Sequence, residues 1–349
     1  MFMNARFGFS LLASVIAAAA GFAQETSPPA QPVPGTINLD VVVTSKSGPP
    51  VSGLQQQDFT VLDNKVPQTI TSFRAVHERD APIEVVLVVD DVNTGLTTIA
   101  YERSETDKFL KMDGGRLSHP MALAFVTDAG IKVQNDFSTD GNGLSASLDQ
   151  YTLGLHDILR SGGVYSAFER FQVSMEALFE LASHEAARPG RKFILWISPG
   201  WPILSGPGIE QQMDAKREHD IFNNVVKLST LLREGSITLY SIDPLGTADF
   251  AGRAIRWEAF TKGISKPSQA DWGDLALQVV ATQSGGLALT ASNDITGSLR
   301  QCLADAQAYY EISYSPSLDQ KREPYHRVEV RLSDRKLTAR TSQGYYPQP

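Results

Sequence analysis

A short apolar run organises the hydrophobic pattern of the whole chain. Residues 83–89 read Ile-Glu-Val-Val-Leu-Val-Val, and the polar residues that follow are Asp90, Asp91, Asn93 and Thr94. A β-branched, nearly continuous apolar run is typical of a parallel strand that is buried on both faces. Because ligands bind beyond the carboxyl ends of such strands in open α/β sheets, these polar residues form the first candidate site.

From this run onward, strand-like and helix-like segments alternate. The predicted strands are 83–89, 121–127, 131–134, 192–197, 236–242 and 287–290. The predicted helices are 97–112, 143–151, 164–187, 213–233, 271–282 and 295–306. Repeated strand-then-helix units predict an α/β fold, a doubly wound and mostly parallel sheet with right-handed crossovers.

Both flanks of this region alternate with the period of a strand instead. Strands are predicted at 37–44, 58–62 and 68–73 before it, and at 309–314, 327–332 and 337–341 after it. Three strands alone are marginally stable, and chain termini commonly lie close together. We therefore expect the segments 37–76 and 309–349 to form one small antiparallel β-sandwich, with the α/β domain at 77–308.

The first residues have the pattern of an export signal. Arg6 precedes an apolar run from Phe7 to Ala20, and Gly21-Phe22-Ala23 offers small residues for cleavage after Ala23. The run is too short for a good membrane span. We expect a signal peptide at 1–23, a Pro- and Gln-rich linker at 24–36, and a protein that is periplasmic or extracellular with no transmembrane segment in its mature form.

Composition narrows the classes of partner. The chain has 349 residues, 42% hydrophobic and 20% charged, with a formal net charge of −8. Nucleic-acid binding needs clustered Lys and Arg, so an acidic chain of this kind predicts no nucleic-acid partner. Cys302 is the only cysteine, which excludes an intramolecular disulfide; its helical apolar neighbours predict a buried thiol.

Three separated segments carry a resemblance to a known family. They are "LDVVVTSKSGPPVSGLQQQDFTVLDNKVPQTITSF" before the core, "RKFILWISPGWP" within it, and "AYYEISYSPSLDQKREPYHRVEVRLSDRKLTARTSQGYY" after it. With Asp90 at the end of the first core strand, they resemble the von Willebrand factor type A-related family of exported proteins abundant in Acidobacteria. The resemblance covers Ile37 to Tyr346 and implies a type A, Rossmann-like core of an interaction type without catalytic activity.

The resemblance also implies a place for a metal-ion-dependent adhesion site. Type A domains hold Mg²⁺ with an Asp-x-Ser-x-Ser sequence, a later Thr, and an Asp after the fourth strand. Asp90 matches the first Asp and Thr94 supplies the second hydroxyl, but Val92 replaces the first Ser. The Thr position falls near Ser161, and Ser198 replaces the last Asp.

Most ligands of that site are therefore missing, and we expect a degenerate site with no bound cofactor. A divalent cation such as Mg²⁺, if held by Asp90 and Thr94, would bind weakly, because a hydroxyl-rich set neutralises little of its charge. The alternative is that Asp90 and Thr94 hydrogen-bond the loop and cap the next helix.

Trp201 lies in the Gly- and Pro-rich loop after strand 192–197, at the predicted ligand-facing edge. An aromatic ring at that place is a candidate binding contact. The alternative is a ring that folds down onto the end of the sheet.

No sequence motif of an enzyme is present. The chain lacks a Gly-x-Ser-x-Gly elbow and a phosphate-binding loop, and its six histidines lack zinc-site spacing. The leading hypothesis is a non-catalytic, adhesion-type module that binds a protein or glycan of the cell envelope or extracellular space. The alternatives are a structural envelope component with no ligand site and a hydrolase of envelope polymers.

Overall fold

The computed structural model describes residues 35–46, 48–81, 83–134, 136–151, 163–204, 213–246, 257–317 and 323–347. All of them belong to one unit that spans residues 35–349. The predicted signal peptide and most of the predicted linker lie outside the described residues. Within these ranges, no helix combines the length and the apolar character that crossing a membrane requires.

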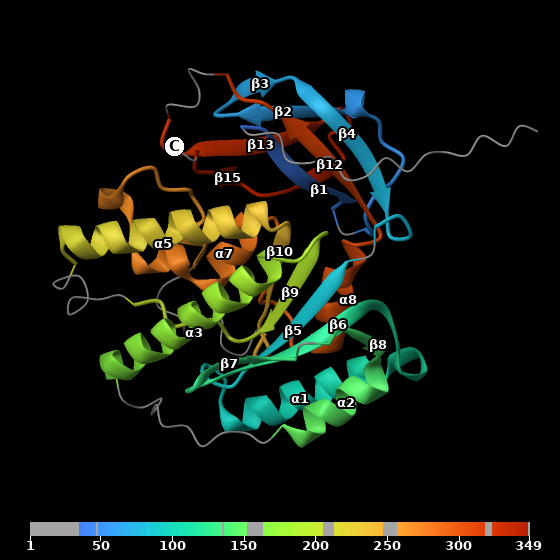
Figure 1. The fold of residues 1–349 in the computed structure, drawn as a ribbon, viewed down its shortest axis with the longest axis vertical. Helices are drawn as coiled ribbons and strands as arrows, with labels where there is room; N and C mark the ends of the chain where they lie inside the picture. Colours follow the sequence, from blue (N-terminus) through green and yellow to red (C-terminus); the bar gives the residue numbers. More distant parts are fainter. Residues whose placement is uncertain are drawn as a thin grey trace, which may run out of the picture. The chain divides into compact units, whose positions relative to one another are not determined.

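A seven-stranded sheet forms the centre of the α/β part (Figure 1). Its strand order is β11-β10-β9-β5-β6-β7, and β8 also pairs with β6. The strands are β5 (Glu84–Asp90), β6 (Arg116–Thr127), β7 (Gly130–Val133), β8 (Ser138–Asp140), β9 (Lys192–Ile197), β10 (Ile237–Ile242) and β11 (Ala288–Leu289). Neighbours from β11 to β6 are parallel, whereas β7 and β8 run antiparallel to β6. The prediction of an α/β fold with a mostly parallel sheet is confirmed at this level.

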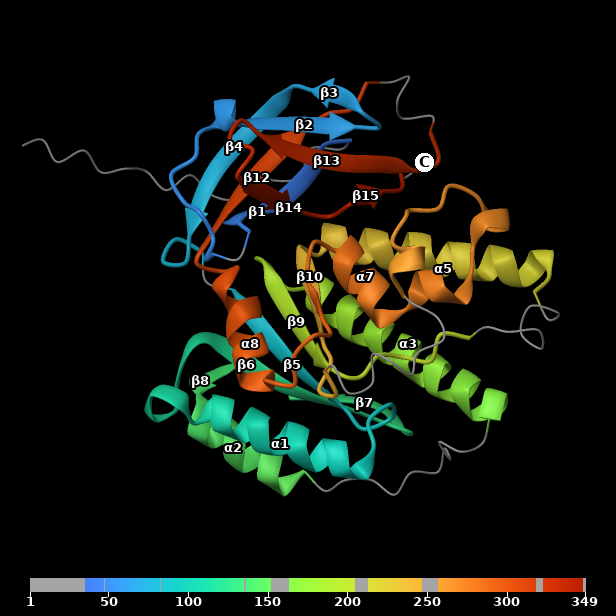
Figure 2. The ribbon, with the colours of Figure 1, turned by 180° about the vertical axis from the view of Figure 1, so that it is seen from behind.

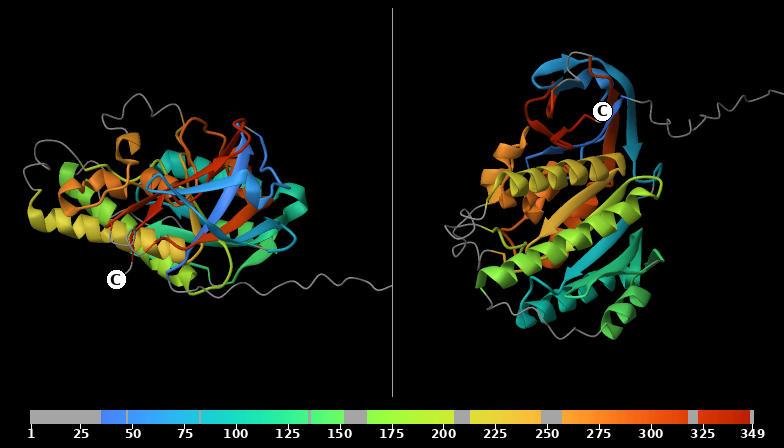
Figure 3. Two further views of the ribbon diagram at one scale, coloured as in Figure 1. Left: turned by 90° about the horizontal axis from the view of Figure 1, so that it is seen from above. Right: turned by 60° about the vertical axis from the view of Figure 1, so that its left-hand side comes forward.

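Helices cover both faces of the sheet (Figures 1 and 2). The α-helices are α1 (Leu96–Leu110), α2 (Gly141–Gln150), α3 (Gly163–Ala186), α5 (Ala215–Glu234), α7 (Leu277–Gln283) and α8 (Ile295–Ala304). Short 3₁₀ helices are η1 (Gln56–Asp58), η2 (Met112–Gly115), η3 (Trp257–Phe260), η4 (Pro267–Gln269) and η5 (Trp272–Leu275). One apolar cluster joins the sheet to α3, α5 and α7, and a second joins its other face to α1, α2 and α8. Figure 3 shows α3 and α5 side by side on the first face.

The central strand β5 explains why its sequence is apolar at nearly every position. Val86 and Val88 belong to the cluster on one face, whereas Val85, Leu87 and Val89 belong to the cluster on the other. Alternate side chains of a strand point to opposite faces, so a strand covered on both needs apolar residues throughout. Cys302 is fully buried in the second cluster, as its neighbours predicted.

One predicted helix is divided in the structure. The segment 271–282 forms the 3₁₀ turn η5 and the short helix α7, separated by Ala276 in an extended conformation. The side chains of Asp271 and Asp274 cap η5 reciprocally. This reciprocal capping ends η5 as a separate turn. The periodicity of apolar residues along 271–282 does not reveal the break.

Strands from the two ends of the chain form two four-stranded antiparallel sheets, with orders β14-β1-β12-β4 and β15-β13-β2-β3. The strands are β1 (Ile37–Ser45), β2 (Phe59–Asp63), β3 (Val66–Gln68), β4 (Ile70–His77), β12 (Ala308–Tyr314), β13 (His326–Leu332), β14 (Leu337–Arg340) and β15 (Gly344–Tyr345). A third apolar cluster lies between the sheets and contains residues of both. Neither end of the chain supplies a complete antiparallel sheet, because each of these two sheets contains strands from both ends.

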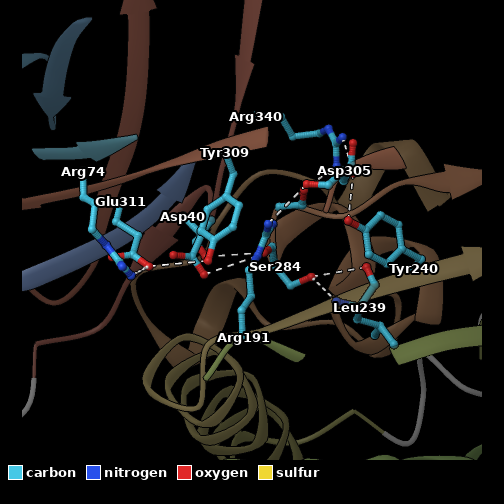
Figure 4. A network of polar contacts seen from close by, with 12 residues as sticks. Asp40, Arg74, Arg191, Leu239, Tyr240, Ser284, Asp305, Tyr309, Glu311 and Arg340 are labelled. Carbon is cyan, nitrogen blue, oxygen red and sulfur yellow. Dashed lines mark hydrogen bonds and ion pairs between the residues drawn. The ribbon is translucent and has the colours of Figure 1, made fainter. Parts of the chain in front are cut away.

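Two arginines join these sheets to the α/β part (Figure 4). Arg340 of β14 donates to Asp305 Oδ2 over 2.6 Å, and Tyr240 of β10 donates to the same oxygen over 2.8 Å. Arg191 lies 3.4 Å from Asp40 Oδ2, with its guanidinium 4.3 Å from the ring centroid of Tyr309. Because Asp305 is almost fully buried, its charge depends on these protein donors for solvation.

Removing the Arg340 side chain tests this junction. The Arg340→Ala variant leaves the buried carboxylate of Asp305 without its cation, and we expect a loss of about 3 kcal/mol in the free energy of unfolding. The matched control is Arg331→Ala, which removes an exposed pair with Glu329 and is expected to cost less than about 1 kcal/mol. Chemical denaturation followed by tryptophan fluorescence measures both; equal losses would contradict the role of the junction.

Candidate functional site

The carboxylate of Asp90 lies at the end of β5 and is fully buried. Its Oδ1 accepts the backbone N–H of Asn93 over 3.0 Å, and its Oδ2 accepts the Asn93 side-chain amide over 2.9 Å. The indole N–H of Trp196, on the neighbouring strand β9, also donates to Oδ2 over 3.1 Å. The protein itself therefore supplies the hydrogen bonds that a buried carboxylate requires.

The loop after β5 is tied to helix α3 through Asn93. Its side-chain amide donates to Ser174 Oγ over 2.8 Å, and Ser174 Oγ donates to the carbonyl of Arg170 over 2.8 Å. Burial lowers the pKa of Arg170, while the carboxylates of Asp90 and Asp128 act in the opposite direction. The guanidinium of Arg170 thus supplies a positive charge near Asp90.

Asp91 and Thr94 are also buried. The Asp91 carboxylate faces Tyr151: burial, and secondarily the charge and hydrogen bond of Asp91, raise the pKa of Tyr151 to about 12. The Tyr151 ring stacks on Phe125 with centroids 3.7 Å apart. The hydroxyl of Thr94 has no hydrogen-bond partner among the described residues.

The hydroxyl of Ser198, which follows β9, forms a hydrogen bond within its own loop. Its Oγ accepts the backbone N–H of Gly200 over 3.1 Å, and the side chain is fully buried. Gly200 has a φ of +98°, and a Cβ there would meet the Gln278 amide nitrogen at 2.2 Å, so the turn requires glycine. The predicted site residue Ser161 lies outside the described residues.

The side chains at this edge do not fit a divalent cation. Val92 is buried in an apolar cluster and supplies no ligand atom, and both oxygens of Asp90 already accept protein N–H groups. In the described ranges, no three His, Cys, Asp or Glu side chains gather in a way that could hold a metal ion. Mg²⁺ demands an octahedron of oxygens, and here it would first have to displace the donors of Asp90.

Trp201 packs inside the protein and does not project from it. The side chain is 4% exposed, and its ring centroid lies 5.4 Å from that of Trp196 and 6.5 Å from that of Phe171. Phe171 in turn contacts Trp272, whose ring meets Phe168 at 5.5 Å. Trp201 is thus packed as in the alternative of a ring folded onto the end of the sheet, with little of its ring exposed for contact with a ligand.

This series of rings ends at the surface, on the first turns of α3. Tyr165 is 84% exposed, Val164 51% and Phe168 39%. Helix α3 leads into β9, whose first residue pairs with the beginning of β5, so α3 runs against the strands. Its first turns therefore lie at the carboxyl-end edge, the same edge as Asp90, and we call Val164, Tyr165 and Phe168 the α3 patch.

The sequence offered one signal for the α3 patch. Val164 and Tyr165 precede Phe168 by four and three residues, so they continue the apolar face that the helix presents to the core. Periodicity cannot show that this face extends past the sheet and becomes exposed. Arg170 and Trp196 gave no signal, since each lies within an ordinary helix or strand pattern.

Comparisons with known proteins leave the family open. No protein-family model matches the chain, and no curated protein matches it. Among solved structures it is similar to the human COPII-coat protein Sec24c (TM-score 0.32, 11% identity, 79% of this chain and 46% of that chain). Others are proximal thread matrix protein 1 from the mussel byssus (0.30, 13%, 65% and 48%) and the TFIIH p34 N-terminal domain (0.26, 17%, 65% and 98%). The chain spans less than half the length of the first two, and TM-scores this low support no conclusion about function.

The hydrogen bonds of Asp90 make a testable prediction for stability. Asp90→Ala removes the acceptor of two side-chain donors and one backbone donor, and we expect the free energy of unfolding to fall by about 3 kcal/mol. Asp214→Ala, which removes a carboxylate that accepts one N–H at the exposed start of α5, should cost about 1 kcal/mol. Denaturant titration compares the two; a loss at Asp90 no larger than at Asp214 would contradict this description of the site.

Proposed function

We propose that this protein is an exported, non-catalytic interaction module that binds a protein partner through the α3 patch. Its α/β part is, in this proposal, a distant relative of the von Willebrand factor type A domains. The place of Asp90 at the end of a central strand, between helices on both faces, supports that relation.

The exposed apolar side chains of the α3 patch carry the proposal. Tyr165 is 84% exposed and Val164 is about half exposed, so their apolar atoms face water in the free protein. A partner surface that covered them would remove this apolar area from water, which is favourable. Tyrosine is enriched among the residues that dominate protein–protein binding energy, because its ring buries a large area with few rotatable bonds. The patch also lies at the edge of the sheet where α/β proteins bind their ligands.

The rigid packing beneath the patch supports the same function. Phe168 is held edge-on by Trp272, and the contacts continue through Phe171 and Trp201 to Trp196. A binding surface that is already ordered loses less conformational entropy when a partner binds. In this proposal the series of packed aromatic rings holds the α3 patch in position. Trp201 supports the patch as a member of this series and does not contact the partner itself.

A double substitution in the patch tests the function. Val164→Ser with Tyr165→Ser removes most of its exposed apolar surface, and we expect at least tenfold weaker capture of the native partner from envelope extracts, about 1.4 kcal/mol or more. The change should leave the thermal midpoint nearly unchanged, because both residues are exposed.

Val66→Ser is the matched control for that experiment. Val66 is 49% exposed and lies on β3, in the antiparallel sheets. The partner is identified as the protein retained by the wild type and by Val66→Ser but lost from the double variant. If all three proteins retain the same set, the patch is not the binding surface, and the structural role becomes the better hypothesis.

The proposal also requires no metal. We expect the thermal midpoint to stay the same when Mg²⁺, Mn²⁺ or Ca²⁺ replaces a chelator, because the oxygens of Asp90 are already occupied by protein donors. A cation that bound the folded state at a hundredfold excess over its Kd would add about 2.7 kcal/mol of stability. Differential scanning calorimetry detects such a change, and an upward shift that Asp90→Ala abolishes would overturn the metal-free proposal.

A further inference from the structure

A cavity of about 530 Å³ opens at the opposite, amino-terminal edge of the seven-stranded sheet. Strand β6 begins at Arg116, five residues before Met121, which is its first residue to pair with β5. This overhanging part of β6 forms one wall, and the ends of α1 and α8 lie opposite it. The volume is in the range of pockets that enclose small organic ligands.

One part of the cavity lining is apolar. Phe109 and Met121 are buried members of the adjoining core cluster, and Met112, Leu117 and Leu303 are half-buried beside them. Flexible methionine side chains adapt to ligands of different shape. An alkyl chain or an aromatic ring would be removed from water against these groups.

Two arginines stand at the mouth of the cavity. The side chains of Arg116 of β6 and Arg300 of α8 line it, and neither has a hydrogen bond or an ion pair with any residue that the structure describes. Two carboxylates also line it: Glu78, which lies 3.4 Å from His119 Nε2, and the exposed Asp113. Glu78 lies close to His119 in the wall, whereas both guanidinium groups are available to a ligand.

His119 adds a polar group to the wall. The side chain is 5% exposed, and burial lowers the pKa of its imidazole while the charge of Glu78 acts against this. Burial thus disfavours a positive charge on this ring. The positive charge that would attract an anion comes from Arg116 and Arg300.

We infer that this cavity binds a small amphipathic anion, with an apolar chain or ring against the Phe109–Met121 lining and a single carboxylate between Arg116 and Arg300. Guanidinium groups bind carboxylates through paired hydrogen bonds, which are stronger than those between neutral groups. Asp113 at the same mouth disfavours ligands with several negative charges. The inference concerns a separate site and does not depend on the α3 patch.

Titration calorimetry with dodecanoate, below its micelle concentration, tests the site. We expect one molecule to bind per chain, and the uncharged dodecanol to bind more weakly by about tenfold or more. Arg116→Ala with Arg300→Ala should remove that preference for the carboxylate. Ala304→Phe, which places a ring in the cavity from α8, should abolish binding of both probes.

Three controls locate the binding. Arg331→Ala removes an exposed arginine elsewhere and should leave dodecanoate binding unchanged. Val164→Ser with Tyr165→Ser should also leave it unchanged, which separates this site from the α3 patch. Circular dichroism confirms that each variant is folded.

Two outcomes would overturn the inference. One is the absence of saturable dodecanoate binding by the wild-type protein. The other is binding that persists in a folded Ala304→Phe variant, which would place the probe elsewhere on the molecule.

Discussion

The structure of the carboxyl-end edge of the seven-stranded sheet depends on the hydrogen bonds that stabilise one buried carboxylate. Asp90 ends the buried central strand β5 and is fully removed from water, which would be costly for an unpartnered charge. Asn93 and Trp196 supply the hydrogen bonds that offset this cost. In doing so they connect the loop after β5 to β9 and, through Ser174, to α3. The same contacts that hold the loop occupy the oxygens that a metal would need.

In the antiparallel sheets, a second buried carboxylate is also stabilised by hydrogen bonds from protein groups. Asp63 of β2 accepts hydrogen bonds from Tyr314 and Tyr345 over 3.1 and 2.7 Å, and its other oxygen lies 2.7 Å from His326 Nδ1. These partners come from β12, β13 and β15, so one charge ties four strands from both ends of the chain together. A hydrogen-bonded charge can be held inside the protein without a metal, and it orders every element that donates to it.

The two edges of the seven-stranded sheet offer different chemistry. At the carboxyl end, the carboxylate of Asp90 is buried and hydrogen-bonded within the chain, and the exposed feature is the apolar α3 patch. At the amino end, a partly apolar cavity is lined by two guanidinium groups that have no partner among the described residues. The first suits the broad surface of a protein, and the second suits a small anion with an apolar body. Both differ from a cation-dependent adhesion site.

The sequence by itself determined the elements of the fold. The alternation of buried strands and amphipathic helices predicted the α/β class, and the β-branched run at β5 predicted a strand covered on both faces, since either feature follows from local periodicity. Only the tertiary structure decided how the strands at the two ends pair, that Trp201 is buried, and that Tyr165 and Val164 are exposed. Whether a side chain is buried or exposed depends on where the apolar face of its helix or strand ends and on what packs against that face. Residues distant in the sequence determine both of these. The partners of Asp90 show the same limit: Asn93 is three residues away, but Trp196 reaches it only because β9 lies beside β5.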